Sequence, residues 1–163
     1  MRIGRYIYIM CIALVMLVSC TEVSDNAVPA YPVSINLSTA GYWQTYGVHS
    51  PGAYRLFVKS DRIPANYPYT ANTYTGFGGV MLVSDIYTNT PKAYDLSCPV
   101  ECKSNVRIAI DEKTYEAVCA SCGSRYDVMG GWGTPISGKA LIRKVGLSRY
   151  SVVQKGAGYN ILN

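Results

Sequence analysis

At residues 98–102 the chain has the sequence Cys-Pro-Val-Glu-Cys, and at residues 119–123 it has Cys-Ala-Ser-Cys-Gly. Two close pairs of cysteines, separated by a hairpin, allow two turns to bring four sulfur atoms to one point, as in tetrahedral thiolate sites. The second pair has the usual spacing of a metal knuckle, and the first pair is one residue longer. This pattern predicts a cluster of four sulfurs, from Cys98, Cys102, Cys119 and Cys122.

The spacing alone leaves the state of these cysteines open. Thiolates at such spacing bind zinc or iron, but cysteines in an oxidising compartment also form one or two disulfides. From the residues, metal and disulfide are equally good interpretations of the cluster, with metal slightly preferred for the knuckle and its following glycine.

The rest of the chain favours short antiparallel strands. Tyrosine is unusually common, with 15 residues, and valine and threonine are frequent, a composition typical of strands and turns. Alternating or continuous apolar runs predict strands at residues 33–37, 53–59, 78–84, 93–96, 124–128, near 141, 150–153 and 159–162, with a hairpin joining 106–110 to 115–118. Residues 60–76 contain Pro64 and Pro68 and are expected to be mostly loop. No amphipathic helix of ten residues is expected, so the fold class is all-β.

The N-terminus predicts export and lipid attachment. Arg2 and Arg5 precede an apolar stretch over residues 6–18 that is too short to span a bilayer comfortably. It ends in Leu-Val-Ser-Cys at residues 17–20, which resembles the lipobox cleaved in bacterial lipoproteins. Three parts are expected: a signal peptide at 1–19, a lipidated tether at 20–32 and a folded domain at 33–163, with Cys20 carrying the lipid. An uncleaved anchor and an ordinary signal peptide are the alternatives.

The expected location is the cell envelope, with the lipid anchor in a membrane. Glu22 and Asp25 follow the lipidated cysteine closely and are compatible with display at the outer membrane or the cell surface. Without Arg2 and Arg5, thirteen basic and ten acidic residues remain, a net charge of +3. No run of Lys or Arg follows, so no nucleic-acid partner is expected.

The sequence contains no catalytic constellation. His49 is the only histidine, and it lies in a Gly/Ser/Pro turn where a surface role is expected, so no Ser/His or Cys/His pair can form. The protein is therefore not expected to be an enzyme. Tyrosines together with Trp43 and Trp132 could form a face for glycan or protein contacts, or cover a small core; the sequence does not identify such a partner.

Several runs around the cysteines carry a family resemblance. Cys122 is followed by Gly-Ser-Arg-Tyr-Asp at 123–127, by Gly-Lys-Ala at 138–140 and by Leu-Ser-Arg-Tyr at 147–150, while Gly-Gly-Val-Met-Leu-Val at 78–83, Ala-Tyr-Asp at 93–95 and Cys-Pro at 98–99 precede it. These runs resemble the two cluster loops and flanking strands of Rieske iron–sulfur (2Fe-2S) domains, over about residues 53–155. The resemblance implies a Rieske-like all-β domain with two cysteine-bearing loops at one end.

The resemblance also shows where the ligands differ. Val100 and Cys122 occupy the two positions at which Rieske domains have their ligand histidines, so a centre with two histidines is excluded. Cys98, Cys119 and Cys122 remain as sulfur donors, and Cys102 is the expected fourth. An all-thiolate site favours zinc or a 2Fe-2S cluster of low potential, and a scaffold without cofactor, held by disulfides, is the third option.

Two functions follow from these observations. The first is a metal-binding or electron-transfer module on the cell envelope. The second is a non-catalytic surface lipoprotein that uses the same scaffold for binding or structure, with its cysteines in disulfides or holding structural zinc. Iron–sulfur proteins are brown, whereas the zinc and disulfide forms are colourless.

The lipid anchor yields the first prediction. Several acyl chains on one residue hold a protein firmly on a membrane, so Cys20→Ala should move the protein into the soluble or the uncleaved fraction. Membrane fractionation with immunoblotting measures this. A Cys20→Ala protein that is cleaved and still fractionates with membranes as the wild type does would exclude lipidation at this residue.

Overall fold

The computed structural model describes residues 27–163; the expected signal peptide and Cys20 lie outside the described residues. Over residues 27–163 the fold is all-β, as expected, with antiparallel sheets and two short helices. The elements, in chain order, are β1 (Val33–Leu37), α2 (Ala40–Tyr46), β2 (Tyr54–Phe57), β3 (Tyr74–Thr75), β4 (Val80–Ser84), β5 (Pro91–Asp95), β6 (Ala109–Asp111), β7 (Glu116–Val118), β8 (Arg125–Asp127), β9 (Thr134–Ser137), α3 (Lys139–Arg143), β10 (Arg149–Lys155) and β11 (Gly158–Leu162).

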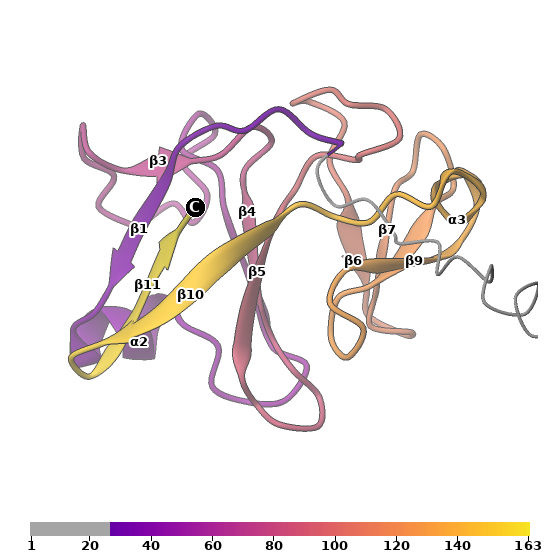
Figure 1. Cartoon of the computed structure of the whole chain (residues 1–163). Helices are drawn as coiled ribbons and strands as arrows, with labels where there is room; N and C mark the ends of the chain where they lie inside the picture. The colour runs from indigo at the N-terminus through magenta and orange to yellow at the C-terminus, as the bar shows by residue number, and fades with distance from the viewer. Residues whose placement is uncertain (1–26) are drawn as a thin grey trace, which may run out of the picture.

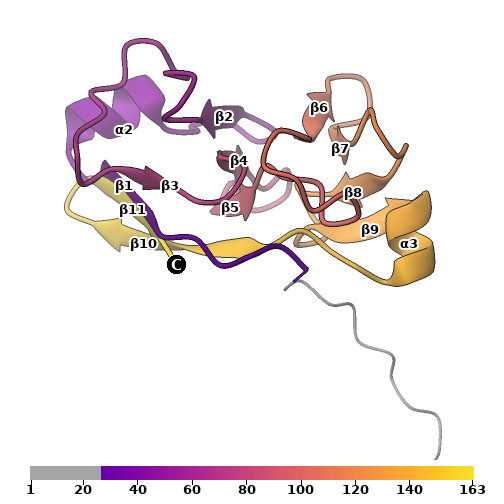
Figure 2. The same cartoon turned by 90° about the horizontal axis from the view of Figure 1, so that it is seen from above.

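The larger sheet has seven strands in the order β2-β4-β5-β10-β11-β1-β3 and curls into a nearly closed barrel (Figure 1). Each neighbouring pair is antiparallel, and Ile35 of β1 lies opposite Ile161 of β11. The second sheet is a four-stranded meander, β6-β7-β8-β9, set beside the barrel, as Figure 2 shows from above. The hairpin expected around residues 111–114 is β6-β7, with Ile110 opposite Ala117.

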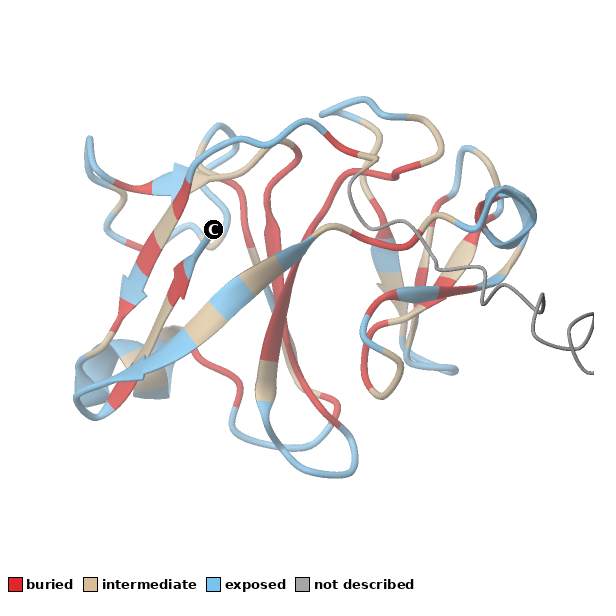
Figure 3. Ribbon diagram, viewed as in Figure 1, coloured by how far each residue is buried: buried red, intermediate tan, exposed pale blue. Residues whose placement is uncertain are grey.

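Strands β4 and β5 form the wall between two hydrophobic cores. All five residues of β4 are buried (Figure 3). Because successive side chains of a strand point to opposite faces, Val80 and Leu82 enter the barrel core with Ile35, whereas Met81 and Val83 enter the core shared with the small sheet. This double burial explains why β4 has a continuous apolar run rather than an alternating one.

The structure corrects the strand expected near Leu141. Residues 139–143 form the short helix α3, which follows Gly138 and ends at Lys144 in the left-handed conformation. Only Ala140 of this helix is buried and Leu141 is exposed, so the apolar residues of this segment do not mark a strand. Helix α2 begins after Thr39, whose hydroxyl accepts a hydrogen bond from the Tyr42 amide. Both helices are shorter than ten residues.

The segment expected to be a tether contacts the domain before residue 33. Residues 27–32 form no helix or strand, but Val28 is buried. The Gly76 amide donates to the Pro32 carbonyl, and the rings of Tyr31 and Phe77 lie 5.4 Å apart. Within residues 27–163, no helix has the length and apolarity needed to cross a bilayer.

Asp95 ties the end of β5 to three other segments. Its carboxylate is fully buried and accepts hydrogen bonds from the Phe77 and Gly78 amides, from the amide and hydroxyl of Ser97, and from the Tyr150 hydroxyl. The donors lie before β4, after β5 and on β10. A buried carboxylate is tolerated because these donors replace its water.

We therefore predict that Asp95→Ala strongly destabilises the domain. The variant leaves the buried amides of Gly78 and Ser97 and the half-buried amide of Phe77 without their acceptor, at a cost of about 3 kcal/mol or more. Tyr150→Phe removes one donor and should cost about 1–2 kcal/mol. Urea unfolding followed by circular dichroism measures both. Equal effects of the two variants would contradict the central role of the carboxylate.

Candidate metal centre

The first cysteine loop leaves β5 immediately after the Asp95 contacts. The Cys98 amide donates to the Val106 carbonyl, and the Cys102 amide donates to the Cys98 carbonyl at 2.8 Å, which closes the turn of residues 98–102. Cys102 has a positive φ of 49° at the end of this turn. The start of the loop is thus held by the sheet, and Cys98 is fully buried.

The second loop lies between β7 and β8 and is closed in the same way. The Cys119 amide donates to the Ser124 carbonyl, and the Gly123 amide donates to the Cys119 carbonyl, both at 2.9 Å. Gly123 has a φ of 70°, a conformation that glycine adopts without steric cost. Helix α3 supports the loop, because the Ala140 amide donates to the Ser124 hydroxyl.

Close packing under this loop explains the glycine at 138. A β-carbon at Gly138 would lie 2.8 Å from the Gly123 carbonyl oxygen and 2.8 Å from the Ser124 α-carbon, both backbone atoms. The residue has a φ of 75° as well. The Gly-Lys-Ala run at 138–140 thus places α3 directly against the second cysteine loop.

The two loops bring three of the four expected sulfurs together. The sulfur atoms of Cys98, Cys119 and Cys122 all lie within 4.8 Å of one another, and those of Cys98 and Cys122 are 3.6 Å apart. Cys98 and Cys119 are buried and Cys122 is half-buried. The expectation that the two cysteine loops meet at one end of the domain agrees with this arrangement.

Cys102 lies outside this group. Its side chain is exposed, and its thiol donates to the carbonyl of Ala27 at 3.4 Å, where the described chain begins. Among residues 27–163, no fourth Cys, His, Asp or Glu belongs to the sulfur group. His49 is exposed, and its Nε2 lies 2.9 Å from the Trp43 carbonyl oxygen at the end of α2.

Two hydroxyl groups contact the sulfurs, and the cysteine spacing does not predict them. The Tyr126 hydroxyl lies 3.7 Å from the Cys98 sulfur, and the Cys122 thiol donates to the Ser124 hydroxyl at 3.1 Å. The only sequence signal for them is the Gly-Ser-Arg-Tyr run that directly follows Cys122.

The surroundings shift the thiols in opposite directions. Burial raises the pKa of Cys98 to about 12, so this group is a neutral thiol near pH 7 when no metal is bound. Burial also acts to raise the pKa of Cys122, but its hydrogen bonds with Ser124 and the neighbouring cysteines outweigh this and lower it. Because metals bind thiolates, loading the site must release the Cys98 proton.

The donor set fits a thiophilic metal ion. Two thiolates on one tetrahedral zinc ion, each about 2.3 Å from the metal, lie about 3.8 Å apart. The 3.6 Å between Cys98 and Cys122 is close to this separation.

Val100, between the first two cysteines of the sequence motif, offers no donor side chain to the sulfur group. Val100 packs against the core shared with the small sheet, and its carbonyl accepts a hydrogen bond from Arg143. Comparison of the chain with protein-family models, curated proteins and solved structures found no match.

We predict graded reactivity of the four thiols in the native, metal-free protein. Cys102 should react first with a thiol reagent because it is exposed, Cys122 should follow, and Cys98 and Cys119 should react only after unfolding. Alkylation with iodoacetamide, followed by peptide mass spectrometry over time, gives the order. Native Cys119 reacting as fast as Cys102 would contradict the burial of the site.

Proposed function

We propose that the protein is a lipid-anchored module of the cell envelope that holds a single thiophilic metal ion, zinc foremost, between the two cysteine loops of a Rieske-like domain. One observation carries this proposal: three sulfurs from two separate loops lie within 4.8 Å of one another, at a separation suited to one tetrahedral ion. When bound, zinc would supply structural cross-linking of the loops, because it has no redox chemistry of its own.

Each residue of the site has a distinct part in this function. Cys98 and Cys119 would be anchoring ligands, because both are buried and held by backbone hydrogen bonds. Cys122 is the most accessible of the three and would be the first to meet an incoming ion. The Tyr126 and Ser124 hydroxyls contact the Cys98 and Cys122 sulfurs and would hold these ligands in orientation.

Iron and electron transfer form the second candidate. The observation that favours it is the Tyr126 hydroxyl at the Cys98 sulfur, because hydrogen bonds to sulfur are one of the ways in which proteins tune the potential of iron–sulfur sites. The metal content and the colour of the purified protein separate this candidate from zinc.

The described chain supports the placement of this site near the anchor. Ala27 lies against Cys102 on the first cysteine loop, and six residues, 21–26, separate it from the expected lipid on Cys20. The seven residue-to-residue steps from Cys20 to Ala27 span at most about 25 Å. An acylated Cys20 would therefore keep the cysteine end of the domain within about 25 Å of the membrane surface.

Metal analysis of the protein purified without added metal tests the proposal. We expect close to one zinc per chain, no brown colour, and titratable thiols at the site only after unfolding with a chelator. Cys119→Ser should lose the metal and lower the melting temperature, because it removes a ligand. Cys102→Ser is the matched control and should keep the metal, since its sulfur lies outside the group.

Other outcomes would decide against this form of the site. Two irons per chain with a visible spectrum that Cys119→Ser bleaches would favour the iron–sulfur candidate. Loss of metal in Cys102→Ser would show that four sulfurs bind the ion. Absence of metal, together with no titratable thiol until a reductant is added, would show structural disulfides and exclude electron transfer.

A further inference from the structure

Strand β2 forms one edge of the seven-stranded sheet and pairs with β4 on one side only. Just beyond it, Val58 exchanges two backbone hydrogen bonds with Ile63, at 2.8 and 3.0 Å, on the side away from β4. Backbone groups of a strand alternate between its two edges, so those of Tyr54 and Leu56 face the same side as those of Val58. No residue in the described part of the chain pairs with Tyr54 or Leu56 along this edge.

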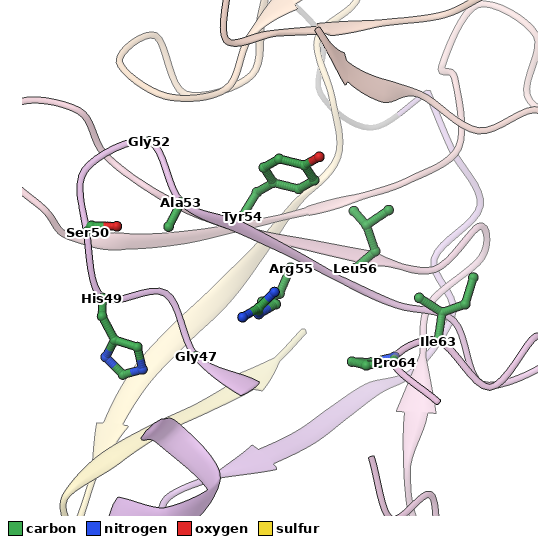
Figure 4. Close-up of a pocket in the computed structure, with 10 residues that line it drawn as sticks. All are labelled: Gly47, His49, Ser50, Gly52, Ala53, Tyr54, Arg55, Leu56, Ile63 and Pro64. Carbon is green, nitrogen blue, oxygen red and sulfur yellow. The ribbon is translucent and has the colours of Figure 1, made fainter. Parts of the chain in front are cut away.

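A groove of about 560 Å³ runs along this open edge. Figure 4 shows β2 crossing it, with the turn of residues 47–52 at one end and Ile63 and Pro64 at the other. The four residues of β2 span about 13 Å at about 3.3 Å per residue. The groove is thus long enough for about four residues of an extended chain.

The two faces of β2 give the groove different chemistry. Tyr54 and Leu56 point to one face and pack against the core shared with the small sheet, whereas Arg55 points to the opposite face, toward His49 (Figure 4). Arg55 is exposed, and its guanidinium forms no ion pair or hydrogen bond within residues 27–163. The residues that line the groove include no Asp or Glu.

We propose that this groove binds an extended peptide segment of a partner protein, in which one acidic residue stands between two apolar residues. The segment would add to the sheet as a strand beside β2, taking up the free backbone groups of Tyr54 and Leu56. Residues directly opposite each other share a face, so the acidic side chain would pair with Arg55 and its apolar neighbours would lie beside Tyr54 and Leu56. This site is independent of the cysteine centre.

Charge argues against a second copy of the chain as the occupant. Antiparallel pairing of two β2 strands would bring two Arg55 side chains onto the same face close together, and like charges on neighbouring strands destabilise the pair. An acidic residue instead forms a charge-assisted hydrogen bond with the guanidinium. The same arginine thus discourages self-association and selects an acidic partner.

Fluorescence anisotropy with the purified full chain tests this proposal. The probe is a fluorescein-labelled, end-capped peptide Thr-Val-Glu-Val-Thr, and the comparison peptides replace its Glu with Lys or carry methyl groups on the backbone nitrogens. We expect saturable binding of the acidic peptide, weakened about tenfold or more by Arg55→Glu, which should instead bind the lysine peptide. Lys139→Glu makes the same change of charge on α3, far from the groove, and should bind as the wild type does.

Backbone methylation separates strand addition from simple charge attraction. The methylated peptide cannot donate to the Tyr54 and Leu56 carbonyls, so its binding should be lost. The proposal is overturned by no saturable binding of the acidic peptide up to about 1 mM, which is the weak end of specific association. It is also overturned by equal binding of the acidic and lysine peptides, by an unchanged Arg55→Glu, or by full binding of the methylated peptide.

Discussion

The buried carboxylate of Asp95 is the constraint on which the cysteine site depends. Asp95 lies at the end of β5, three residues before Cys98. Its carboxylate oxygens accept hydrogen bonds from the Phe77 amide before β4, from the Ser97 amide at the start of the first cysteine loop and from the Tyr150 hydroxyl on β10. A carboxyl group buried to this extent is stable only with its hydrogen-bond partners in place. The direction in which the chain leaves β5 is therefore set by a polar network, and Cys98 takes its position from that direction.

Hydrophobic packing also positions the cysteines, in addition to the hydrogen bonds of Asp95. Cys98 and Cys119 are members of the same hydrophobic core as Met81, Tyr94 and Tyr126, so their sulfurs belong to the interior of the domain rather than to mobile loops. In many small metal-binding domains, binding and folding are one event, because no site exists before the metal arrives. Here the core already brings the three sulfurs together, so in the proposed metal centre less of the binding free energy would be needed to order them.

The sequence predicts a strand correctly where burial produces a run of apolar residues, and it fails where local packing decides the conformation. The continuous apolar run at 80–83 indicates a strand buried on both faces, which β4 is, and the hairpin of residues 106–118 follows from two apolar runs around a polar turn. The segment near Leu141 is a helix because Gly138 and the packing of Ala140 on the second loop decide its conformation, and neither effect produces a periodic sequence pattern.

The cysteine spacing predicts that the two loops meet, but it does not predict that the Cys102 side chain points away from the other three sulfurs. That depends on a positive φ and on contact with Ala27, which lies 75 residues earlier. The groove beside β2 depends likewise on segments separated in sequence.

The cluster contains three sulfurs, and this number bears on the choice between metal binding and disulfides, which the cysteine spacing leaves open. A disulfide uses two cysteines, and Cys98 and Cys122, whose sulfurs are 3.6 Å apart, would be the pair that needs the least movement. That bond would leave Cys119 as a buried thiol beside it, while Cys102, on the surface at Ala27, could not join the third sulfur without rearranging its turn. A single metal ion uses all three clustered sulfurs at once and accepts a fourth ligand from solvent or from another molecule. The proposed metal centre would therefore use all three clustered sulfurs, and one of the four cysteines could stand apart from it.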